Sequence, residues 1–436
     1  MYTLNETHDP GLRSWVESAN SAETDFPIQN LPFCVFRRKE TQETCRAGVA
    51  IGDFVLDVPA ALPAFDGLAL EAALACGNDS LNSLMALSPA HWSALRLRLS
   101  QILRAGHADR AALQECLVRQ DAIEFAMPAK IGDFTDCLAS LHHASKSARI
   151  VRADDPILPN FPWLPIAYHG RASSIRLSGH SFPRPHGQTK DPSSGRPTFG
   201  PCQKLDYELE LGVYIGGRTE LGSTVPLDEA GNHIFGLTLL NDWTARDMML
   251  WEFVPLGPFL SKNFATSVSP WVVTLEALEP FRQAWFRAND VPAPLPYLDS
   301  ASNRERGQID VELEVSLLTP KAAAQGRPPE VLSHSNLADA YWTIGQLVTH
   351  HASNGCNLEP GDLIGTGTLS GPGLDESGCL LEMSEGGRRE IVLANGERRT
   401  YLQDGDTIVM KARSEAPGFR SIGFGEVSGT VLPARE

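Results

Sequence analysis

Residues 206–216 read DYELELGVYIG, a run of strand-forming residues that is interrupted by two glutamates. Successive side chains of a β-strand point to opposite faces, so Glu208 and Glu210 share one face while Tyr207 and Leu209 share the other. Two carboxylates on one face repel each other unless that face is solvated or holds a cation. The stretch therefore predicts a strand that carries either a solvated acidic face or a cation site.

The chain from about residue 128 onward consists of short apolar runs separated by glycine and proline, a pattern typical of a β-rich sandwich, roll or barrel. One helix is expected within this part, from residue 336 to about residue 353, because apolar residues recur there at helical spacing. The clearest apolar runs are HIFGLTLLND (233–242), PWVVTLEAL (270–278), DVELEVSLL (310–318), GDLIGTGTL (361–369) and GDTIVMKA (405–412).

The first part of the chain has a different composition. Residues 33–58 resemble a β-hairpin with a turn at Gly52-Asp53. The segments 62–77, 89–105 and 107–120 are rich in alanine and leucine with apolar residues at helical spacing, which predicts helices. The change in composition at residues 122–129 predicts two domains, 1–125 and 126–436.

Whole-chain composition limits the classes of partner. The 436 residues carry 37 Lys and Arg against 53 Asp and Glu, a formal net charge of −16. This charge argues against nucleic acid or an anionic membrane as the main partner. The eight cysteines include no CxxC pair, and no 18 consecutive residues are apolar, so we expect a cytoplasmic protein with reduced thiols and no membrane span.

Two further acids come where apolar runs meet polar loops. Asp242 ends the run GLTLLND, and Asp136 lies in KIGDFTDCLAS. Together with Glu208 and Glu210 they form the ligand set expected of a hard cation such as Mg²⁺ or Ca²⁺, both of which prefer carboxylate oxygens. The spacing leaves open whether the four side chains converge, so a solvated acidic face remains the alternative.

Nine stretches of the chain resemble, in order and spacing, the fumarylacetoacetate hydrolase family. The resemblance implies a mainly β (α+β) fold, with an N-terminal SH3-like barrel domain followed by a mixed β-sandwich roll domain that forms a homodimer and carries the active site. The stretches are DFPIQNLPFCVF (25–36), AGVAIGDFVLDV (47–58), KIGDFTD (130–136), YHGRASSI (168–175), LDYELELG (205–212), LLNDWTARD (239–247), VPLGPFLSKNFATSVSPWVV (254–273), THHASNGCNLEPGDLIGTGTLSGP (349–372) and IGFGEVSGTVLPA (422–434).

The resemblance also implies roles for individual residues. Four acids fall on the family's positions for a divalent metal, Mg²⁺ or Ca²⁺, with two further residues behind the metal: Asp136, Glu208, Glu210 and Asp242, then Lys262 and Thr266. The catalytic positions are the base His143, its orienting carboxylate Glu382, and the cations Arg246 and Lys262. Substrate contacts are implied for Arg152, Tyr168 and Thr368.

Three substrate-contact positions depart from the family pattern. Leu138 and Phe253 stand where the family has tyrosine, and Met249 stands where it has glutamine. Each exchange removes a polar group, and an apolar wall selects its ligand by shape and size rather than by hydrogen bonds. The metal and histidine positions are retained, so the departures concern the choice of substrate.

The resemblance implies metal-dependent hydrolysis of a C–C bond in a 1,3-diketone acid, with 4-fumarylacetoacetate giving fumarate and acetoacetate as the leading substrate. A His held by a carboxylate is suited to taking a proton from water, and a divalent ion is suited to binding two diketone oxygens. One alternative is a relative that acts on a less polar β-diketone or acylpyruvate by hydrolysis, decarboxylation or C–C bond formation. A second is a catalytically silent dimer that binds metal and ligand.

Overall fold

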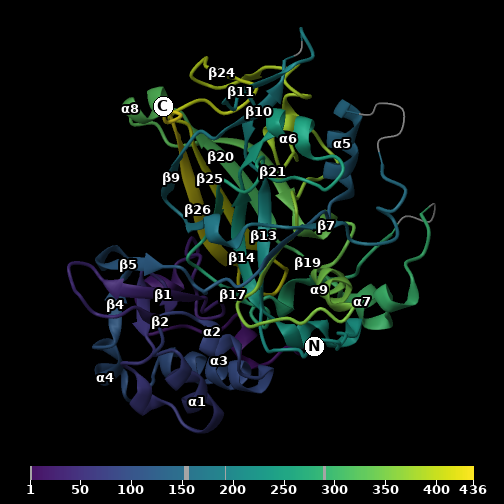
Figure 1. The fold of residues 1–436 in the computed structure, drawn as a ribbon. Helices are drawn as coiled ribbons and strands as arrows, with labels where there is room; N and C mark the ends of the chain where they lie inside the picture. The colour runs from purple at the N-terminus through teal and green to yellow at the C-terminus, as the bar shows by residue number, and fades with distance from the viewer. Residues whose placement is uncertain (1, 152–156, 192, 288–290) are drawn as a thin grey trace.

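The computed structural model describes residues 2–151, 157–191, 193–287 and 291–436 (Figure 1). The fold is mainly β, with short helices, as the sequence predicts. Within the described residues, none of the helices combines the length and the apolar composition that a membrane crossing requires.

The first part of the chain forms a five-stranded antiparallel sheet with helices packed around it, drawn in purple and blue in Figure 1. Gly52, with φ +54°, supplies the left-handed turn between the second and third strands, where sequence predicts the turn. The strands, in sheet order, are β4 (Leu117–Arg119), β3 (Phe54–Asp57), β2 (Arg46–Ile51), β1 (Phe33–Arg38) and β5 (Ile123–Ala126). The helices are α1 (Gly67–Ala75), α2 (Asn82–Met85), α3 (Pro89–Leu103) and α4 (Arg110–Gln114).

Three of the predicted helices are shorter than expected. The segment 62–77 forms a 3₁₀ turn at Leu62–Ala64 and then α1, which begins at Gly67. The segment 107–120 contains only α4, and then Leu117–Arg119 pairs with β3 as an edge strand, so tertiary pairing overrides its helical pattern. The helix expected from residue 336 begins at Ile344 instead, because Thr343 and Gln346 form a capping box at that point. The preceding residues make a single 3₁₀ turn that Asn336 caps.

The second part of the chain is built on a mixed eight-stranded sheet at the centre of Figure 1. Most neighbouring strands are antiparallel, but β22 runs parallel to β6, and β16 runs parallel to β8. In sheet order the strands are β7 (Ala167–His169), β6 (Phe134–Cys137), β22 (Leu363–Gly365), β13 (Leu209–Ile215), β14 (Ile234–Asp242), β16 (Thr266–Val268) and β8 (Ile175–Leu177), with β17 (Val273–Thr274) also paired to β14.

A five-stranded sheet packs against this central sheet, and their facing side chains form the largest apolar core. Gly429 allows close approach of the two sheets, since a Cβ there would lie 2.5 Å from the Trp243 ring. The strands, in sheet order, are β21 (Glu330–Asn336), β20 (Glu312–Leu318), β25 (Thr407–Ser414), β26 (Ile422–Leu432) and β9 (His180–Pro183).

Short strand pairs and helices complete this part of the chain, and several of them lie around one end of the central sheet. The pairs are β10 (His186–Lys190) with β11 (Pro197–Pro201), β12 (Leu205–Asp206) with β15 (Thr244–Ala245), β18 (Arg282–Gln283) with β19 (Gln308–Ile309), and β23 (Ile391–Val392) with β24 (Arg398–Arg399). The helices are α5 (Leu141–Val151), α6 (Arg246–Glu252), α7 (Ala301–Arg306), α8 (Pro320–Ala324), α9 (Ile344–Ala352) and α10 (Leu380–Met383).

Candidate active site

The four acids predicted to bind a metal converge. Asp136 lies near the end of β6, Glu208 lies immediately before β13, Glu210 lies within β13, and Asp242 ends β14. All four are buried, and one carboxylate oxygen of each lies within 4.8 Å of the others. The solvated-face alternative for the two glutamates is therefore wrong.

Gly365 on β22 makes room for this cluster between two of its members. It pairs with Asp136 on one side and with the β13 strand on the other. A Cβ at this position would lie 2.5 Å from Oδ1 of Asp136 and 3.0 Å from Oε2 of Glu210. The sheet register thus directs two carboxylates into a space that any larger residue would fill.

The donor atoms of this cluster fit a hard divalent cation. Oδ1 of Asp136 and Oε1 of Glu210 are buried, and neither accepts a hydrogen bond from a described residue. Buried carboxylate oxygens without donors are costly unless a cation or a proton satisfies them. Burial and the charge of Asp242 raise the pKa of Asp136 to about 7, and burial and the charge of Asp136 raise the pKa of Glu210 well above its ordinary value.

Three more of the predicted residues contact the cluster directly. Nζ of Lys262 forms ion pairs with Glu208 and with Oδ2 of Asp242, the latter at 2.7 Å. Thr266 Oγ1 donates to Oδ1 of Asp242 at 2.8 Å, and the hydroxyl of Tyr168 donates to Oδ2 at 2.9 Å. The Asp242 carboxylate is therefore contacted by one ammonium group, from Lys262, and by two hydroxyl groups, from Thr266 and Tyr168.

Lys262 also affects ionisation within the cluster. Burial alone would raise the pKa of Glu208, but the charges of Lys262 and Arg246 outweigh it and hold the pKa below its ordinary value. Burial, together with the charges of Asp136 and Asp242, raises the pKa of the Tyr168 hydroxyl well above its ordinary value. Tyr168 therefore remains a neutral hydrogen-bond donor.

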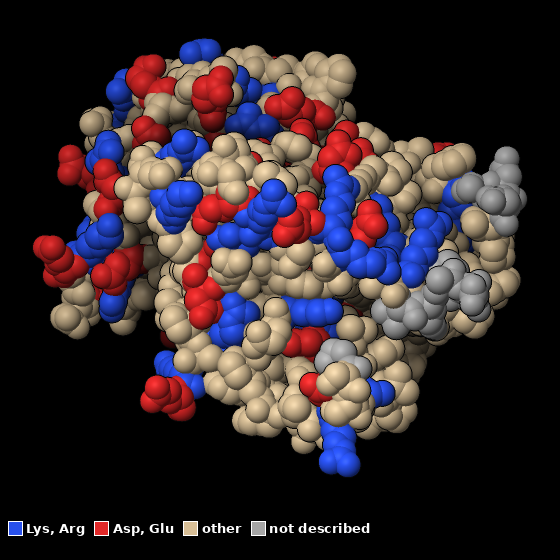
Figure 2. Space-filling model, turned by 90° about the horizontal axis from the view of Figure 1, so that it is seen from above, with Lys and Arg blue, Asp and Glu red and all other residues tan. Residues whose placement is uncertain are grey.

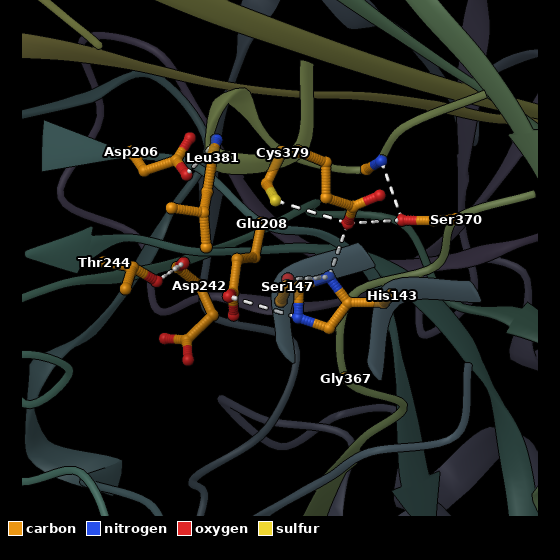
Figure 3. Close-up of polar contacts among 12 residues, drawn as sticks. His143, Ser147, Asp206, Glu208, Asp242, Thr244, Gly367, Ser370, Cys379 and Leu381 are labelled. Carbon is orange, nitrogen blue, oxygen red and sulfur yellow. Dashed lines mark hydrogen bonds and ion pairs between the residues drawn. The ribbon is translucent and has the colours of Figure 1, made fainter. Parts of the chain in front are cut away.

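His143 lies beside this cluster, in the first turn of α5. Ser140 Oγ accepts a hydrogen bond from the His143 backbone N–H at 3.1 Å, which anchors the start of that helix. Nδ1 of the ring lies 2.5 Å from Oε1 of Glu382 on α10, and Nε2 lies 4.0 Å from Oε1 of Glu208. Figure 3 shows the His143 ring beside Glu208.

Glu382 has further contacts besides its predicted partner His143. Its Oε1 also accepts from Ser370 Oγ at 2.8 Å and from the Cys379 thiol at 3.4 Å, and Lys146 Nζ lies 3.6 Å from Oε2. Burial acts to raise the pKa of Glu382, but the hydrogen bond from His143 and the neighbouring positive charges hold it below its ordinary value. An ionised Glu382 fixes the proton of His143 on Nδ1 and leaves Nε2 as the basic nitrogen.

Arg246 does not pair with its sequence neighbours Asp247 and Glu252. Its Nε donates to Asp206 at 2.9 Å and its Nη1 forms an ion pair with Glu208 at 2.7 Å. Although burial lowers the pKa of Arg246, the charges of Glu208 and Asp206 raise it well above its ordinary value. The guanidinium is therefore a permanent cation at the edge of the carboxylate cluster.

A cavity of about 400 Å³ joins these groups. Its lining combines charged residues of the site with an apolar wall that includes all three predicted departures, Leu138, Met249 and Phe253. Tyr168 and Thr368 also line it, and Thr368 Oγ1 has no partner among the described residues. The predicted substrate contact Arg152 lies outside the described residues.

Sequence reasoning missed three residues that hold this site together. Lys146 bonds the carbonyl oxygens of Gly371 and Gly373 as well as approaching Glu382. Ser370 and Asp206 bond Glu382 and Arg246, respectively. Asp206 begins the stretch DYELELG and Ser370 lies in GTGTLSG, but nothing in either spacing indicates the distant partner.

Comparison with known proteins places the chain among named relatives. Residues 134–432 match the model of the fumarylacetoacetate hydrolase C-terminal family, and residues 29–128 match the fumarylacetoacetase N-terminal family. The fumarylacetoacetase of Arabidopsis thaliana is 44% identical over 432 residues, 97% of this chain and 99% of the relative. That of Oryza sativa subsp. japonica is 43% identical over 432 residues, 97% and 98% of the two chains.

Solved structures show a similar fold at lower sequence identity. The fumarylacetoacetate hydrolase of Exiguobacterium antarcticum is 18% identical, with a TM-score of 0.50, and the match covers 93% of this chain and all of the other. The full-length sequence matches and the two family models lead to one conclusion. The chain belongs to the fumarylacetoacetase family.

Proposed function

We propose that this chain hydrolyses a C–C bond of a 1,3-diketone acid, with fumarylacetoacetate as substrate and fumarate and acetoacetate as products. The observation that carries the proposal is one cavity whose lining brings His143, which is paired with the buried Glu382, together with Asp136 and Glu208 of the four-carboxylate cluster. Fumarylacetoacetases that are 43% and 44% identical over 97% of this chain support the choice of substrate.

We propose Asp136, Glu208, Glu210 and Asp242 as ligands of Mg²⁺ or Ca²⁺. Such an ion, when bound, supplies Lewis-acid polarisation of the diketone oxygens. Lys262 and Thr266 hold the Asp242 carboxylate in place, and Lys262 offsets part of the negative charge that four acids bring together.

His143 is the proposed general base. With its proton fixed on Nδ1 by Glu382, its free Nε2 takes a proton from the attacking water as the new C–O bond forms at the ketone carbon. The C–C bond then breaks, and its electron pair goes to the carbon of the departing acetoacetate unit. His143 returns the proton to that carbon, which leaves the histidine neutral for the next cycle.

Arg246 and Lys262 are the proposed stabilisers of the oxyanion that forms when water adds. Both line the cavity, and both are held by carboxylates rather than left to rotate. Donors fixed before the reaction do not have to reorganise during it, which is why such groups lower the barrier. Thr368 and Tyr168 are the proposed hydroxyl contacts to the substrate, and Arg152 is the proposed carboxylate contact.

The test is to incubate the purified protein with fumarylacetoacetate and follow the loss of diketone absorbance. We expect turnover with Mg²⁺ or Ca²⁺, loss of turnover after chelation, and its return when the ion is restored. A protein that binds the ion but leaves fumarylacetoacetate intact would contradict the proposal and favour a silent binding protein.

A second substrate class is favoured by the apolar wall of the cavity. Leu138, Met249 and Phe253 all line it, and their side chains offer no hydrogen bond to a substrate oxygen. We therefore propose a β-diketone or acylpyruvate with a less polar end group as an additional substrate. Comparing kcat/KM for fumarylacetoacetate with that for an alkyl acylpyruvate distinguishes the two classes.

We also propose the domain division 1–125 and 126–436, an SH3-like description of the first domain, and a cytoplasmic homodimer.

The homodimer is supported by an exposed apolar segment after α6, in which Val254 is 69% exposed and Leu256 is 94% exposed. Acidic and basic side chains are interspersed on the face shown in Figure 2. Such a mixed surface presents no continuous basic face to a polyanion.

A further inference from the structure

Asp206 connects two groups that the proposed function uses, although it contacts neither the carboxylate cluster nor His143. It is fully buried, and both of its carboxylate oxygens are occupied. Oδ1 accepts from the backbone N–H groups of Tyr207 at 2.9 Å and Leu380 at 2.8 Å. Oδ2 accepts from the Leu381 N–H and from Nε of Arg246, each at 2.9 Å.

One pair of these bonds fixes the element that carries Glu382. Leu380 and Leu381 are the first two residues of α10 and Glu382 is the third. The residue before the helix, Cys379, provides no side-chain cap, so the Asp206 carboxylate satisfies the first amides instead. Asp206, drawn beside Leu381 in Figure 3, thereby holds the turn that carries Glu382, whose Oε1 contacts Nδ1 of His143.

The bond from Nε to Asp206 fixes the orientation of Arg246. Its planar guanidinium is held at Nε by Asp206 and at Nη1 by Glu208, so the direction of Nη2 is set as well. Nη2 is buried and has no partner among the described residues, and Arg246 lines the cavity. This is the donor that remains for a substrate oxygen.

The contacts close into a ring around the histidine. Nδ1 of His143 contacts Glu382, and the helix that carries Glu382 is bonded to Asp206. Asp206 in turn bonds Arg246, which forms an ion pair with Glu208. The Glu208 carboxylate lies 4.0 Å from Nε2 of His143, which completes the ring. We propose that Asp206 is a positioning residue that sets the orientation of both the general base and the oxyanion donor. This inference rests on the proposed function, in which those two groups act on substrate.

The substitution Asp206→Asn tests the inference with almost no change in shape. All four neighbours of the carboxylate are donors, so the amide nitrogen of asparagine must face at least one of them donor to donor. Loss of an outer partner that orients a metal ligand lowers activity by about 10–100-fold, and Asp206 orients Arg246, which holds the proposed ligand Glu208. We expect a fall of that size in kcat on fumarylacetoacetate for the Mg²⁺-saturated enzyme, with a smaller change in KM.

Asp406→Asn is the matched control. Asp406 is also fully buried, accepts from Nε and Nη2 of Arg399 at 2.8 and 2.9 Å, and accepts from the Gln403 N–H at 2.8 Å. It does not line the described cavity. The control variant should lose comparable stability in thermal melts and keep the parental kcat.

A second readout does not depend on turnover. The proton on Nδ1 of His143, bonded to Glu382, should give a downfield NMR resonance that disappears in His143→Ala. Asp206→Asn should shift this resonance in the metal-free protein, whereas Asp406→Asn should leave it in place. An inactive parent enzyme would refute the proposed function, but the resonance would still test the effect of Asp206 on His143.

Parental kcat and an unshifted resonance in Asp206→Asn would overturn the inference, as would equal losses of kcat in the two asparagine variants. If Asp206→Asn does not fold, Asp206→Glu takes its place, because it keeps the carboxylate acceptors but displaces them by one methylene. A folded Asp206→Glu variant with a lowered kcat and a shifted resonance would support the positioning role, and one with parental values would overturn it.

Discussion

His143 has a different carboxylate next to each ring nitrogen, and only one of the two contacts is a hydrogen bond. Nδ1 is 2.5 Å from Glu382, whereas Nε2 is 4.0 Å from Glu208, a gap that leaves Nε2 free to accept a proton. His143→Ala should keep the fold and the metal affinity but lower kcat by about 10²–10⁴-fold, the usual contribution of a positioned general base. Steady-state kinetics with saturating Mg²⁺ measures this loss.

The adjacent histidine gives a matched control for that variant. His142 lies one residue earlier on α5 and does not line the described cavity. His142→Ala should therefore retain kcat within a few-fold of the parent. A His143→Ala enzyme that is as active as His142→Ala would remove His143 from the mechanism.

The carboxylate cluster makes the stability of the metal-free protein depend on pH. Burial and neighbouring charge raise the pKa of Asp136 to about 7, so the folded metal-free protein binds this proton more tightly than the unfolded chain does. The resulting stabilisation is fully present below the unfolded pKa, about 3.9, and is lost as pH rises through about 7. Urea denaturation of chelated protein between pH 5 and 8 should show the midpoint falling with pH.

Two comparisons check the origin of that slope. Asp136→Asn should flatten it, because the amide does not titrate, and saturating Mg²⁺ should raise stability most at high pH, where no proton competes for the carboxylates. Asp247→Asn, which changes an acid outside the cluster, should leave the slope as it is. An unchanged slope in Asp136→Asn would mean that other groups control it.

The residues that sequence reasoning identified are those that lie within recognisable motifs. Asp136, Glu208 and Asp242 each lie at or beside a strand end, and their convergence follows from the pairing of strands distant in sequence. Asp206, Ser370 and Lys146 were missed because their partners in the site are distant in sequence. Arg246 lies 40 residues from Asp206, and Glu382 lies 12 residues from Ser370 and 236 residues from Lys146. Single-sequence spacing contains no signal for such contacts.

Among the secondary-structure elements, α6 contributes both a charged residue and apolar residues to the site. Its first residue, Arg246, contacts the carboxylates, whereas Met249 and the following Phe253 contribute to the apolar wall with Leu138 from the end of β6. The triple substitution Leu138→Tyr, Met249→Gln and Phe253→Tyr adds hydroxyl and amide groups at that wall. The ratio of kcat/KM for fumarylacetoacetate to that for an alkyl acylpyruvate should then rise.

The direction of that change follows from hydrogen-bond energetics. A bond to an uncharged partner contributes about 0.5–1.5 kcal/mol, so three together amount to about 10–1,000-fold in the ratio if all form. The changes are made together because neighbouring side chains seldom act additively. A ratio that stays at the parental value would show that the wall does not select the substrate.

Element boundaries were predicted less well than element types. Six strands of the two large sheets coincide with the predicted apolar runs, namely β13, β14, β17, β20, β22 and β25, because an apolar run between glycines is a strong local signal. The other strands of these sheets were not predicted from the sequence. The helix boundaries at residues 107–120 and 336–353 were wrong, since edge pairing with β3 and the Thr343 capping box determine them. Both features depend on specific contacts rather than on apolar periodicity.

At the scale of the whole molecule, the N-terminal part packs directly onto the sheet that carries the site. Phe33 bridges to Val272, and the Trp92 ring meets the Phe235 ring edge-on with centroids 5.3 Å apart. A side chain at Gly216, the residue directly after β13, would collide with Trp92. The absence of a side chain at this position therefore allows α3 to approach the central sheet closely. The N-terminal part therefore covers the end of the central sheet that is distant from α5 and α6 (Figure 1).

The apolar segment after α6 is left uncovered in the single chain and is the surface that we expect to pair in a homodimer. Val254 is 69% exposed, and Leu256, Phe259 and Leu260 are exposed beside it, a concentration that monomeric soluble proteins rarely show without a partner. Val254→Glu would bury a charge in such an interface and should convert the dimer to a monomer. Light scattering coupled to size-exclusion chromatography measures the mass.

Leu221→Glu is the control for the dimer, because Leu221 is 82% exposed but lies outside this segment. It should keep the parental mass, since its charge stays in water. Because Leu256 and Phe253 line the cavity within the same segment, loss of pairing should also raise KM in Val254→Glu, with the His143–Glu382 pair undisturbed. A parent that elutes as a single chain would contradict the homodimer, whereas a Val254→Glu variant that still pairs would place the contact between copies elsewhere on the surface.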